Sequence, residues 1–229
     1  MNAAVIVAGG AGTRMGPGVD KLFLEVGGCP VVAHTWRQFD QADCIDHIIL
    51  VVREGLEQEF FRMGEQYCFG KPHRIVPGGN ERQDSVWNGL AALSPETKIV
   101  AIQDAARPCV TGALIEACIA AAREVGAAVA AQPVVDTIKE SADGRFIERT
   151  LPRSRVWAVQ TPQTFRVEVI RRAIQAARDQ GVSLTDDTAA CELIGQAVRL
   201  VVSSSPNPKV TIPADLPYVE SLLQPHADT

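Results

Sequence analysis

Short apolar runs alternate with amphipathic segments along most of the chain. The runs at residues 3–8, 48–52 and 99–102 predict buried strands, because no polar position interrupts them. Between them, residues 31–39 and 111–125 repeat apolar positions at helical spacing, which predicts helices packed against a sheet. Strands that alternate with helices are typical of an α/β fold, so we expect a mostly parallel sheet with helices on both faces.

The same alternation continues without a linker or an internal repeat, which favours a single domain over residues 1–229. Further helices are predicted at residues 56–65, 82–93, 167–177, 186–194 and 214–223. Further strands are predicted at residues 73–76, 127–131, 156–160 and 198–202.

One segment, at about residues 137–155, departs from this pattern. Residues 137–141 and 145–149 predict two polar strands, and the Asp143-Gly144 pair between them is typical of a hairpin turn. A two-stranded hairpin with so weak an apolar face is only marginally stable by itself. It is therefore either a solvated flap or an arm that packs on a second copy of the chain.

Composition and charge exclude several classes of protein. Apolar residues make up 46% of the 229 positions, yet no run approaches the roughly 20 apolar residues that cross a bilayer. The formal charge of −5 argues against a general nucleic-acid binder. The N-terminus has no signal-peptide pattern. The six cysteines form no C-x-x-C pair or zinc-site spacing, so we expect reduced thiols in a cytoplasmic protein.

A glycine-rich turn directly follows the first strand. Gly9-Gly10-Ala11-Gly12 lacks large side chains, so backbone N–H groups can face an anion there. Arg14 and Lys21 add full positive charges nearby, an arrangement that suits a nucleotide triphosphate. The common dinucleotide pattern fails, because its third glycine is missing and the second strand ends at Arg53 instead of an acid. A plain turn with solvated cations is the alternative.

Further polar residues follow the ends of the predicted strands, where open parallel sheets bind their ligands. Asp104 could coordinate magnesium or accept from a substrate hydroxyl, or it could serve only as a turn residue. Arg107 could form a fork for a second phosphate. Gly78-Gly79 is a second place where backbone can approach a flat ligand, and Ser85 falls in the first turn of the next helix.

Two later groups are ambiguous by themselves. Thr185-Asp186-Asp187 is typical of a helix N-cap with acids that complement the helix dipole. Lys209 follows a rigid Pro-Asn-Pro segment and could be either a binding residue or a solvated cation.

Several segments, taken in chain order, match one known family of enzymes. They are Ala8-Gly9-Gly10-Ala11-Gly12-Thr13-Arg14-Met15, Gly78-Gly79-Asn80-Glu81-Arg82-Gln83-Asp84-Ser85-Val86, Asp104-Ala105-Ala106-Arg107-Pro108, Asp136-Thr137-Ile138-Lys139, Gln160-Thr161-Pro162-Gln163, Leu184-Thr185-Asp186-Asp187 and Lys209-Val210-Thr211. Together they resemble the 2-C-methyl-D-erythritol 4-phosphate cytidylyltransferase family over almost the whole chain. The glycine-rich opening is shared by many sugar nucleotidyltransferases, whereas the second, third and fifth segments in combination are specific.

The resemblance implies a Rossmann-like nucleotidyltransferase fold and a homodimer joined through the hairpin arm. It implies an enzyme of isoprenoid precursor synthesis that joins CTP and methylerythritol phosphate and releases pyrophosphate. Mg²⁺ or another divalent cation would act mainly through the triphosphate, with Asp104 as a candidate ligand.

The resemblance also assigns roles to individual residues. Arg14 and Lys21 would be catalytic, by neutralising the triphosphate and the charge that develops at the α-phosphorus. The nucleotide would be bound by Ala8, Gly9, Gly10, Ala11, Gly12, Gly79, Asn80 and Ser85. The acceptor would be bound, in part from the partner chain, by Asp104, Ala105, Arg107, Thr137, Arg153 (with Arg155 as the neighbouring candidate), Thr161, Thr185 and Lys209.

Three other functions compete with this interpretation. A ribitol-5-phosphate cytidylyltransferase would have similar loops and a different acceptor. A non-catalytic nucleotide sensor would have no need of the Arg14 and Lys21 pair, and a dinucleotide-dependent reductase would need the missing third glycine. We therefore expect a cytidylyltransferase that acts on methylerythritol phosphate.

Overall fold

The computed structural model describes residues 1–10 and 20–224, and within them seven strands form one central sheet. From one edge to the other these strands are β11 (Arg199–Val202), β7 (Ala127–Pro133), β10 (Trp157–Arg166), β6 (Ile99–Asp104), β1 (Asn2–Ala8), β4 (His47–Val52) and β5 (His73–Pro77). All neighbouring strands pair in parallel except β10, which runs antiparallel to both β6 and β7. The α/β class expected from the sequence is confirmed.

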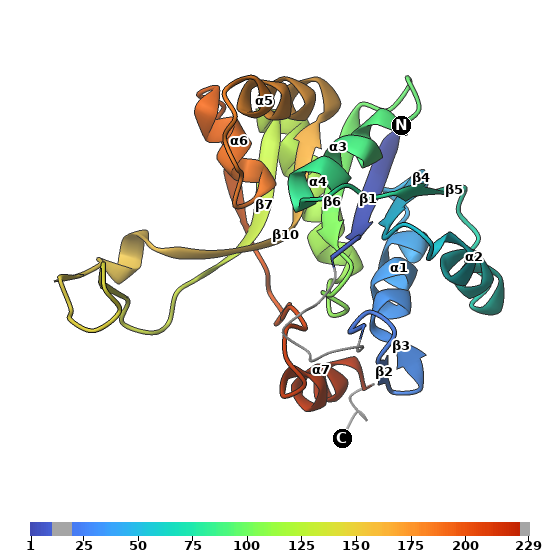
Figure 1. Cartoon of the computed structure of the whole chain (residues 1–229), viewed down its shortest axis with the longest axis horizontal. Coiled ribbons are helices and arrows are strands. Elements are labelled where there is room, and N and C mark those ends of the chain that lie inside the picture. The colour runs from blue at the N-terminus through green and yellow to red at the C-terminus, as the bar shows by residue number, and fades with distance from the viewer. Residues whose placement is uncertain (11–19, 225–229) are drawn as a thin grey trace.

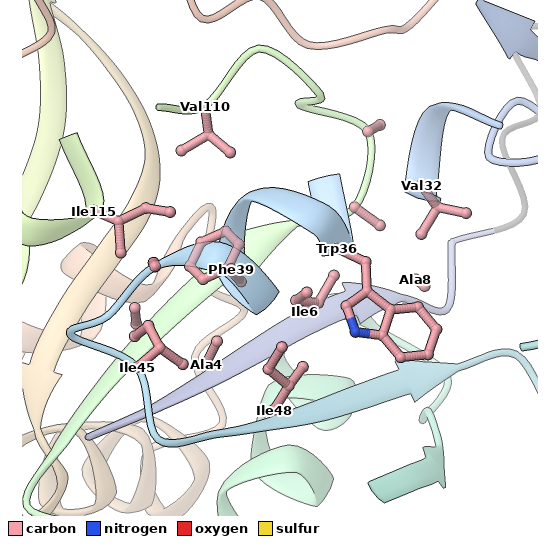
Figure 2. Packing of buried hydrophobic residues seen from close by; sticks show 14 of the residues in the cluster. Ala4, Ile6, Ala8, Val32, Trp36, Phe39, Ile45, Ile48, Val110 and Ile115 are labelled. Carbon is pink, nitrogen blue, oxygen red and sulfur yellow. The ribbon is translucent and has the colours of Figure 1, made fainter. Parts of the chain in front are cut away.

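Helices cover both faces of this sheet (Figure 1). One face carries α1 (Val31–Gln41), α2 (Glu57–Gln66), α4 (Gly112–Val125) and α7 (Asp215–Leu223), and the other carries α3 (Arg82–Ala91), α5 (Val167–Asp179) and α6 (Asp187–Leu193). Successive residues of β1 point to opposite faces, so Ile6 joins the first core and Val5 the second. Figure 2 shows Trp36 and Phe39 of α1 packed near Ile6 and Ile48 in the first core.

Local sequence explains where these helices sit. α4 begins after Thr111, whose hydroxyl accepts a hydrogen bond from the backbone of Leu114 at 3.3 Å, and it ends at Gly126, where φ is +100°. α3 lies very close to the sheet at Gly89. A methyl group added there would lie 2.5 Å from Cγ1 of Val5, so this contact requires glycine.

The arm predicted at residues 137–155 leaves the sheet between β7 and β10 and extends away from the body of the molecule (Figure 1). Its strands are shorter than predicted: β8 (Lys139–Glu140) pairs with β9 (Arg149–Thr150), and a one-turn 3₁₀ helix, η2 (Arg153–Arg155), follows. The predicted two-residue turn is wrong. The side chain of Asp143 accepts hydrogen bonds from the backbone of Arg145 and Phe146, so these N–H groups are unavailable to a strand ladder.

Two other expectations need correction. The strand predicted at residues 156–160 continues to Arg166 as β10, and because β10 is antiparallel, Thr161 lies within a strand instead of following its carboxyl end. The sequence reading also missed a small hairpin, β2 (Glu25–Val26) with β3 (Cys29–Pro30). Gly27 and Gly28 form its turn with φ of +57° and +74°, so the Gly-Gly pair was the available signal.

The structure gives the state of the cysteines and the length of the helices. All six cysteines lie in the described part of the chain and are free thiols; Cys29, Cys109, Cys118 and Cys191 are buried. No helix among the described residues is long and apolar enough to cross a membrane.

Candidate active site

A pocket of about 250 Å³ opens at the carboxyl ends of β1 and β6. The first strand, the turn before α3, the end of β6 and the segment after β11 all contribute to it. Its lining residues are Val7, Ala8, Gly9, Gly10, Lys21, Leu22, Gly79, Asn80, Glu81, Arg82, Ser85, Asp104, Ala105, Ala106 and Lys209. The pocket therefore brings together all six of the described residues that the sequence assigned to the nucleotide and three of those assigned to the acceptor.

The two glycine segments form one side of the pocket around Ser85. The Ser85 hydroxyl accepts from the backbone N–H of Gly79 at 3.0 Å and donates to the carbonyl of Glu81 at 3.2 Å. A methyl group on Gly78 would lie 2.8 Å from Ser85 Oγ, and one on Gly79 would lie 2.3 Å from Cβ of Asp84. A side chain at position 79 would overlap Asp84, so glycine is required there and Gly79 lines the pocket with backbone alone.

The beginning of α3 explains the neighbouring acids. The side chain of Asp84 accepts from the backbone N–H of Glu81 at 3.3 Å, and the Glu81 side chain in turn accepts from the backbone at Asp84. This reciprocal pair is a capping box, so Asp84 has the ordinary capping role that its position in the sequence allowed.

Lys21 also lines the pocket. Its Nζ donates to the carbonyl oxygen of Val210 at 2.8 Å, which links the N-terminal segment to the segment after β11. The preceding residue, Asp20, forms an ion pair of 2.5 Å with Arg53, the residue at the end of the second strand. Ala11, Gly12 and Arg14, which the sequence assigned to the nucleotide and to catalysis, lie outside the described residues.

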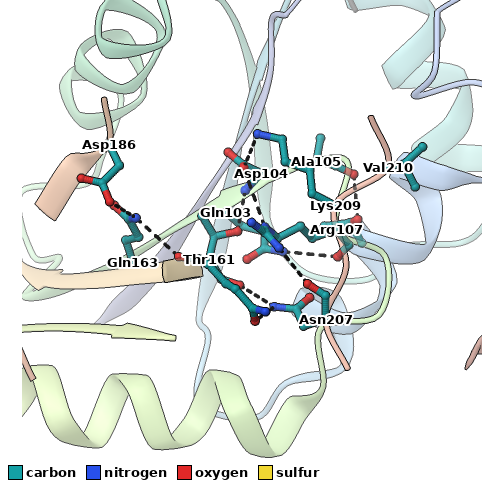
Figure 3. Close-up of polar contacts among 12 residues, drawn as sticks. Gln103, Asp104, Ala105, Arg107, Thr161, Gln163, Asp186, Asn207, Lys209 and Val210 are labelled. Atoms are coloured by element: carbon teal, nitrogen blue, oxygen red, sulfur yellow. Dashed lines mark hydrogen bonds and ion pairs between the residues drawn. The ribbon is translucent and has the colours of Figure 1, made fainter. Parts of the chain in front are cut away.

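Asp104 ends β6 and is buried beside the pocket. Its Oδ2 accepts from Lys209 Nζ at 2.7 Å, and its Oδ1 accepts from Arg82 Nε at 3.2 Å (Figure 3 shows the contact with Lys209). Burial disfavours the charged carboxylate, but Arg82 and Lys209 outweigh it and lower the pKa of Asp104 to about 2. Lys209 is therefore not a solvated cation, and Asp104 is more than a turn residue.

Arg107 lies behind Asp104 and is not among the residues that line the pocket. Its Nη1 donates to the carbonyl oxygen of Asn207 at 2.7 Å, and its Nε lies 3.9 Å from Asp104 Oδ2. Burial lowers the pKa of Arg107, although the Asp104 carboxylate opposes this shift. The Arg107 guanidinium, predicted to bind a second phosphate, thus donates to the protein backbone in this single chain.

Thr161 reaches the site from the middle of β10. Its hydroxyl accepts from the backbone N–H of Asp104 at 3.1 Å, and its carbonyl oxygen accepts from the side chain of Asn207 at 2.8 Å (Figure 3). Thr161 was expected at the carboxyl end of a strand. The antiparallel direction of β10 instead carries the strand past the end of β6, which places Thr161 beside Asp104.

Sequence reasoning missed Arg82 as a site residue and missed its pairing with Asp187, although the predicted place of Asp187 in the first turn of a helix is confirmed. Arg82 donates from Nη1 and Nη2 to the two oxygens of Asp187 at 2.9 and 2.8 Å, so Asp187 is a buried ion-pair partner as well as an acid in the first turn of α6. Burial raises the pKa of Asp187, which Arg82 opposes. A signal existed: Arg82 is the first residue of α3, where a cation is unfavourable for the helix dipole.

Some residues assigned to the acceptor lie outside this pocket within one chain. Thr137 and Arg153 are exposed in the arm, where Arg153 Nη1 donates to the carbonyl oxygen of Val135 at 2.8 Å. Thr185 is exposed in the segment before α6. The N-cap of α6 is Asp186, whose carboxylate accepts from the backbone of Ala189, and not Thr185.

The ionised state of Asp104 predicts an acid-dependent part of the stability. Because the folded-state pKa of about 2 lies below the ordinary 3.8, the ion pairs of Asp104 stabilise the fold above pH 3.8 and are lost as the pH falls towards 2. Asp104→Asn should lower the free energy of unfolding by about 2 kcal/mol at pH 5, and this difference should shrink by pH 2.5. Urea unfolding at both pH values measures it, with the exposed Asp136→Asn as control. A difference that is the same at both pH values would contradict the assignment.

Comparison with known proteins agrees with this geometry. A family model described as 2-C-methyl-D-erythritol 4-phosphate cytidylyltransferase matches residues 2–225. Proteins of that name from Pelotomaculum thermopropionicum and Alkaliphilus oremlandii are 42% and 43% identical to this chain, and each match covers 97% of this chain and 94% of the relative.

Solved structures give the same result. The structure of 4-diphosphocytidyl-2C-methyl-D-erythritol synthase from Anaerococcus prevotii matches with a TM-score of 0.86 and 29% identity, over 97% of this chain and 98% of that one. The structure of 2-C-methyl-D-erythritol 4-phosphate cytidylyltransferase from Thermus thermophilus matches with a TM-score of 0.78 and 31% identity, over 95% and 96%. From the family model, the relatives and the shared fold, the chain belongs to the 2-C-methyl-D-erythritol 4-phosphate cytidylyltransferase family.

Proposed function

We propose that this chain joins CTP and 2-C-methyl-D-erythritol 4-phosphate to give 4-diphosphocytidyl-2-C-methyl-D-erythritol and pyrophosphate, a step in non-mevalonate isoprenoid precursor synthesis. The observation that supports the proposal is that one pocket is lined both by bare backbone and by cations. Gly9 and Gly79 line it without side chains, and Lys21 and Lys209 line it with ammonium groups. A site of this kind suits the meeting of two anionic substrates.

The reaction needs positioning and charge more than proton transfer. An oxygen of the acceptor phosphate forms a bond to the α-phosphorus of CTP, while the bond from that phosphorus to the bridging oxygen of the β-phosphate breaks. The electron pair of the broken bond leaves with pyrophosphate. Because a phosphate oxygen is already an anionic nucleophile, no general base is required. The described residues that line the pocket include no histidine or cysteine, in keeping with this chemistry.

The nucleotide occupies the glycine side of the pocket in this proposal. Close contact between backbone and a flat cytosine is supported by Gly79 and Ser85, because a side chain at position 79 would overlap Asp84. Ala8, Gly9, Gly10 and Asn80 complete this side among the described residues. Lys21, together with Arg14 of the adjacent segment, neutralises the phosphates and the charge that develops at the α-phosphorus.

The acceptor lies towards Asp104 and Lys209. Asp104 is held as a carboxylate and accepts from an acceptor hydroxyl, while the Lys209 ammonium attracts the acceptor phosphate. Ala105 lines this end of the pocket, and Thr161 and Arg107 support Asp104 and the 207–210 segment. Thr137 and Arg153 contribute from the arm of a second copy, because in their own chain they are exposed beside the hairpin and do not line the pocket.

A divalent cation, Mg²⁺, fits this site as a partner of the triphosphate. Within residues 1–10 and 20–224, no group of three or more His, Cys, Asp or Glu side chains could hold a metal ion. Mg²⁺ commonly uses one or two carboxylates together with substrate phosphates, and Asp104 is a carboxylate at the pocket that stays ionised. When bound, the metal would neutralise phosphate charge, mainly through the triphosphate, with Asp104 as its candidate carboxylate ligand.

The arm supports the proposal of a homodimer. Although its strands are polar, the arm exposes Phe146 and Ile147, with 75% and 66% of their surfaces accessible, and Val135, just before the arm, is 80% accessible. Apolar side chains this exposed on a projecting hairpin are expected to pack on another surface. Thr137 and Arg153 flank the same hairpin, so contact with a second copy would carry them to its acceptor site.

The proposal is tested by measuring pyrophosphate release from CTP with three acceptors. We expect the highest kcat/KM with methylerythritol phosphate, a several-fold lower value or none with ribitol 5-phosphate, and no reaction with free methylerythritol. The last expectation follows because each charge-assisted contact to the phosphate contributes roughly 1.5–3 kcal/mol. A clear preference for ribitol 5-phosphate would overturn the acceptor, and no turnover with either phosphate would overturn the function.

Removal of the Lys21 side chain tests its catalytic role. Lys21→Ala should lower kcat by about 100-fold or more, on the scale of one lost preorganised charge, while the protein remains folded. Steady-state kinetics with both substrates, together with a thermal melt, measure this. Lys98→Ala, an exposed lysine outside the pocket, is the matched control and should keep its activity. A folded Lys21→Ala variant with turnover within about threefold of the wild type would refute the role.

Two substitutions in the arm test the dimer. Phe146→Ser combined with Ile147→Ser should give monomers with a raised KM for the acceptor and a nearly unchanged KM for CTP, since both side chains are exposed in the single chain. Light scattering gives the mass, and initial rates give both KM values. Phe61→Ser, an exposed aromatic on α2, is the control for the loss of surface apolar area. A variant that keeps the mass of a dimer and the wild-type acceptor KM would rule out this role of the arm.

A further inference from the structure

The beginnings of α3 and α6 are joined by a clamp of four residues: Arg82, Gln83, Leu184 and Asp187. Arg82 donates to both oxygens of Asp187, at 2.9 and 2.8 Å. The next residue, Gln83, accepts from the backbone N–H of Leu184 at 3.0 Å. Two adjacent residues of α3 thus hold both ends of the 184–187 segment, which lies about a hundred residues away in the sequence.

Gln163 fixes the other side of this clamp to the sheet. It is buried within β10, where its Oε1 accepts from the backbone N–H groups of Asp187 and Thr188 at 2.9 and 3.2 Å. Its Nε2 donates to the carboxylate of Asp186 at 2.9 Å (Figure 3). The first turn of α6 is therefore held by a side chain of the central sheet as well as by α3.

The clamp continues into the pocket. While Nη1 and Nη2 of Arg82 bond to Asp187, its Nε bonds to Asp104, so one guanidinium joins the two carboxylates. Its planar geometry fixes all three groups relative to one another. A rotation that broke the pair with Asp187 would also move Arg82 away from Asp104, and Asp104 holds Lys209.

Stability alone is a poor explanation for this arrangement. Asp187 is only 1% exposed, and a buried ion pair often contributes little net stability compared with apolar residues of similar volume. The first turn of α3 is also an unfavourable place for a cation. The arrangement does, however, fix the orientation of charges at the edge of a substrate pocket.

We propose that Asp187 and Gln163 are positioning residues that hold Arg82 against Asp104, and that the clamp thereby sets the affinity for the acceptor phosphate substrate. The inference rests on the proposed function. It concerns the acceptor and not CTP, because the clamp contacts Asp104, and through it Lys209, which are the residues assigned to the acceptor. The backbone surface assigned to the nucleotide is instead held by Ser85 and by the capping box of α3.

Asp187→Asn tests the clamp with little change of volume. It removes the charge that holds both Nη groups of Arg82, so the KM for methylerythritol phosphate should rise by about tenfold or more, while the KM for CTP stays within about threefold. Arg178→Gln is the matched control. Arg178 also ties α3 to a neighbouring helix through a guanidinium–carboxylate contact, 3.5 Å from Asp84, but it lies outside the pocket.

Chemical rescue separates positioning from mere folding. In Arg82→Ala, methylguanidinium should restore much of the lost kcat/KM for the acceptor, because Asp187 and Asp104 still offer carboxylates to the free cation. In Arg82→Ala combined with Asp187→Asn, the same cation should restore little. If Arg82→Ala does not fold, Arg82→Lys takes its place: it keeps one charge but cannot bond to both carboxylates, so its acceptor KM should rise while its CTP KM does not.

The outcomes distinguish the two proposals. A wild-type protein without turnover on methylerythritol phosphate would refute the proposed function. An active wild type with an unchanged acceptor KM in folded Asp187→Asn would overturn the clamp, and so would equal losses for both substrates or equal rescue of the single and double variants. A selective rise in the acceptor KM, with rescue that depends on Asp187, is the result that supports it.

Discussion

The buried carboxylate of Asp104 is the constraint on which the rest of the site depends. β6 carries it to the edge of the sheet with 12% of its side chain exposed, and a carboxylate so poorly hydrated is costly unless cations compensate it. Among the described residues, Arg82, Lys209 and Arg107 surround it, and each comes from a different segment. The start of α3, the turn after β6 and the segment after β11 therefore meet around one pocket, where each supplies a cation that balances the charge of Asp104.

The same requirement prepares the pocket for anionic substrates. Several cations of the site are held by hydrogen bonds to protein groups: Arg82 by Asp187, Arg107 by the carbonyl of Asn207, and Lys21, which lines the pocket, by the carbonyl of Val210. Charges that are already oriented need little rearrangement when a transition state develops negative charge. In the proposed function, the ion pairs that keep Asp104 ionised are also the elements that would fix where the acceptor phosphate lies.

β10 links this charge centre to the remainder of the fold. As the antiparallel strand of an otherwise parallel sheet, it runs past the carboxyl end of β6 instead of ending there. Thr161 on this strand bonds to the backbone of Asp104, and Gln163 bonds to the first turn of α6. The arm precedes the same strand, so a second copy that contacts the arm would act on an element already joined to the site.

The sequence by itself determined the α/β class, most helices and strands, the glycine segments and the position of Asp104 at a strand end. These features depend on the spacing of apolar residues and on the positions of glycine, which can be recognised within a few residues of sequence. Only the tertiary structure decided the direction of β10, the loop at Asp143 and the partners of Arg82 and Lys209. Arg82 and Asp187 are separated by 105 residues, and so are Asp104 and Lys209. The sequence does not show which charged side chains become buried. The desolvation cost that makes a buried charge require an oppositely charged partner arises only when the fold removes water from it.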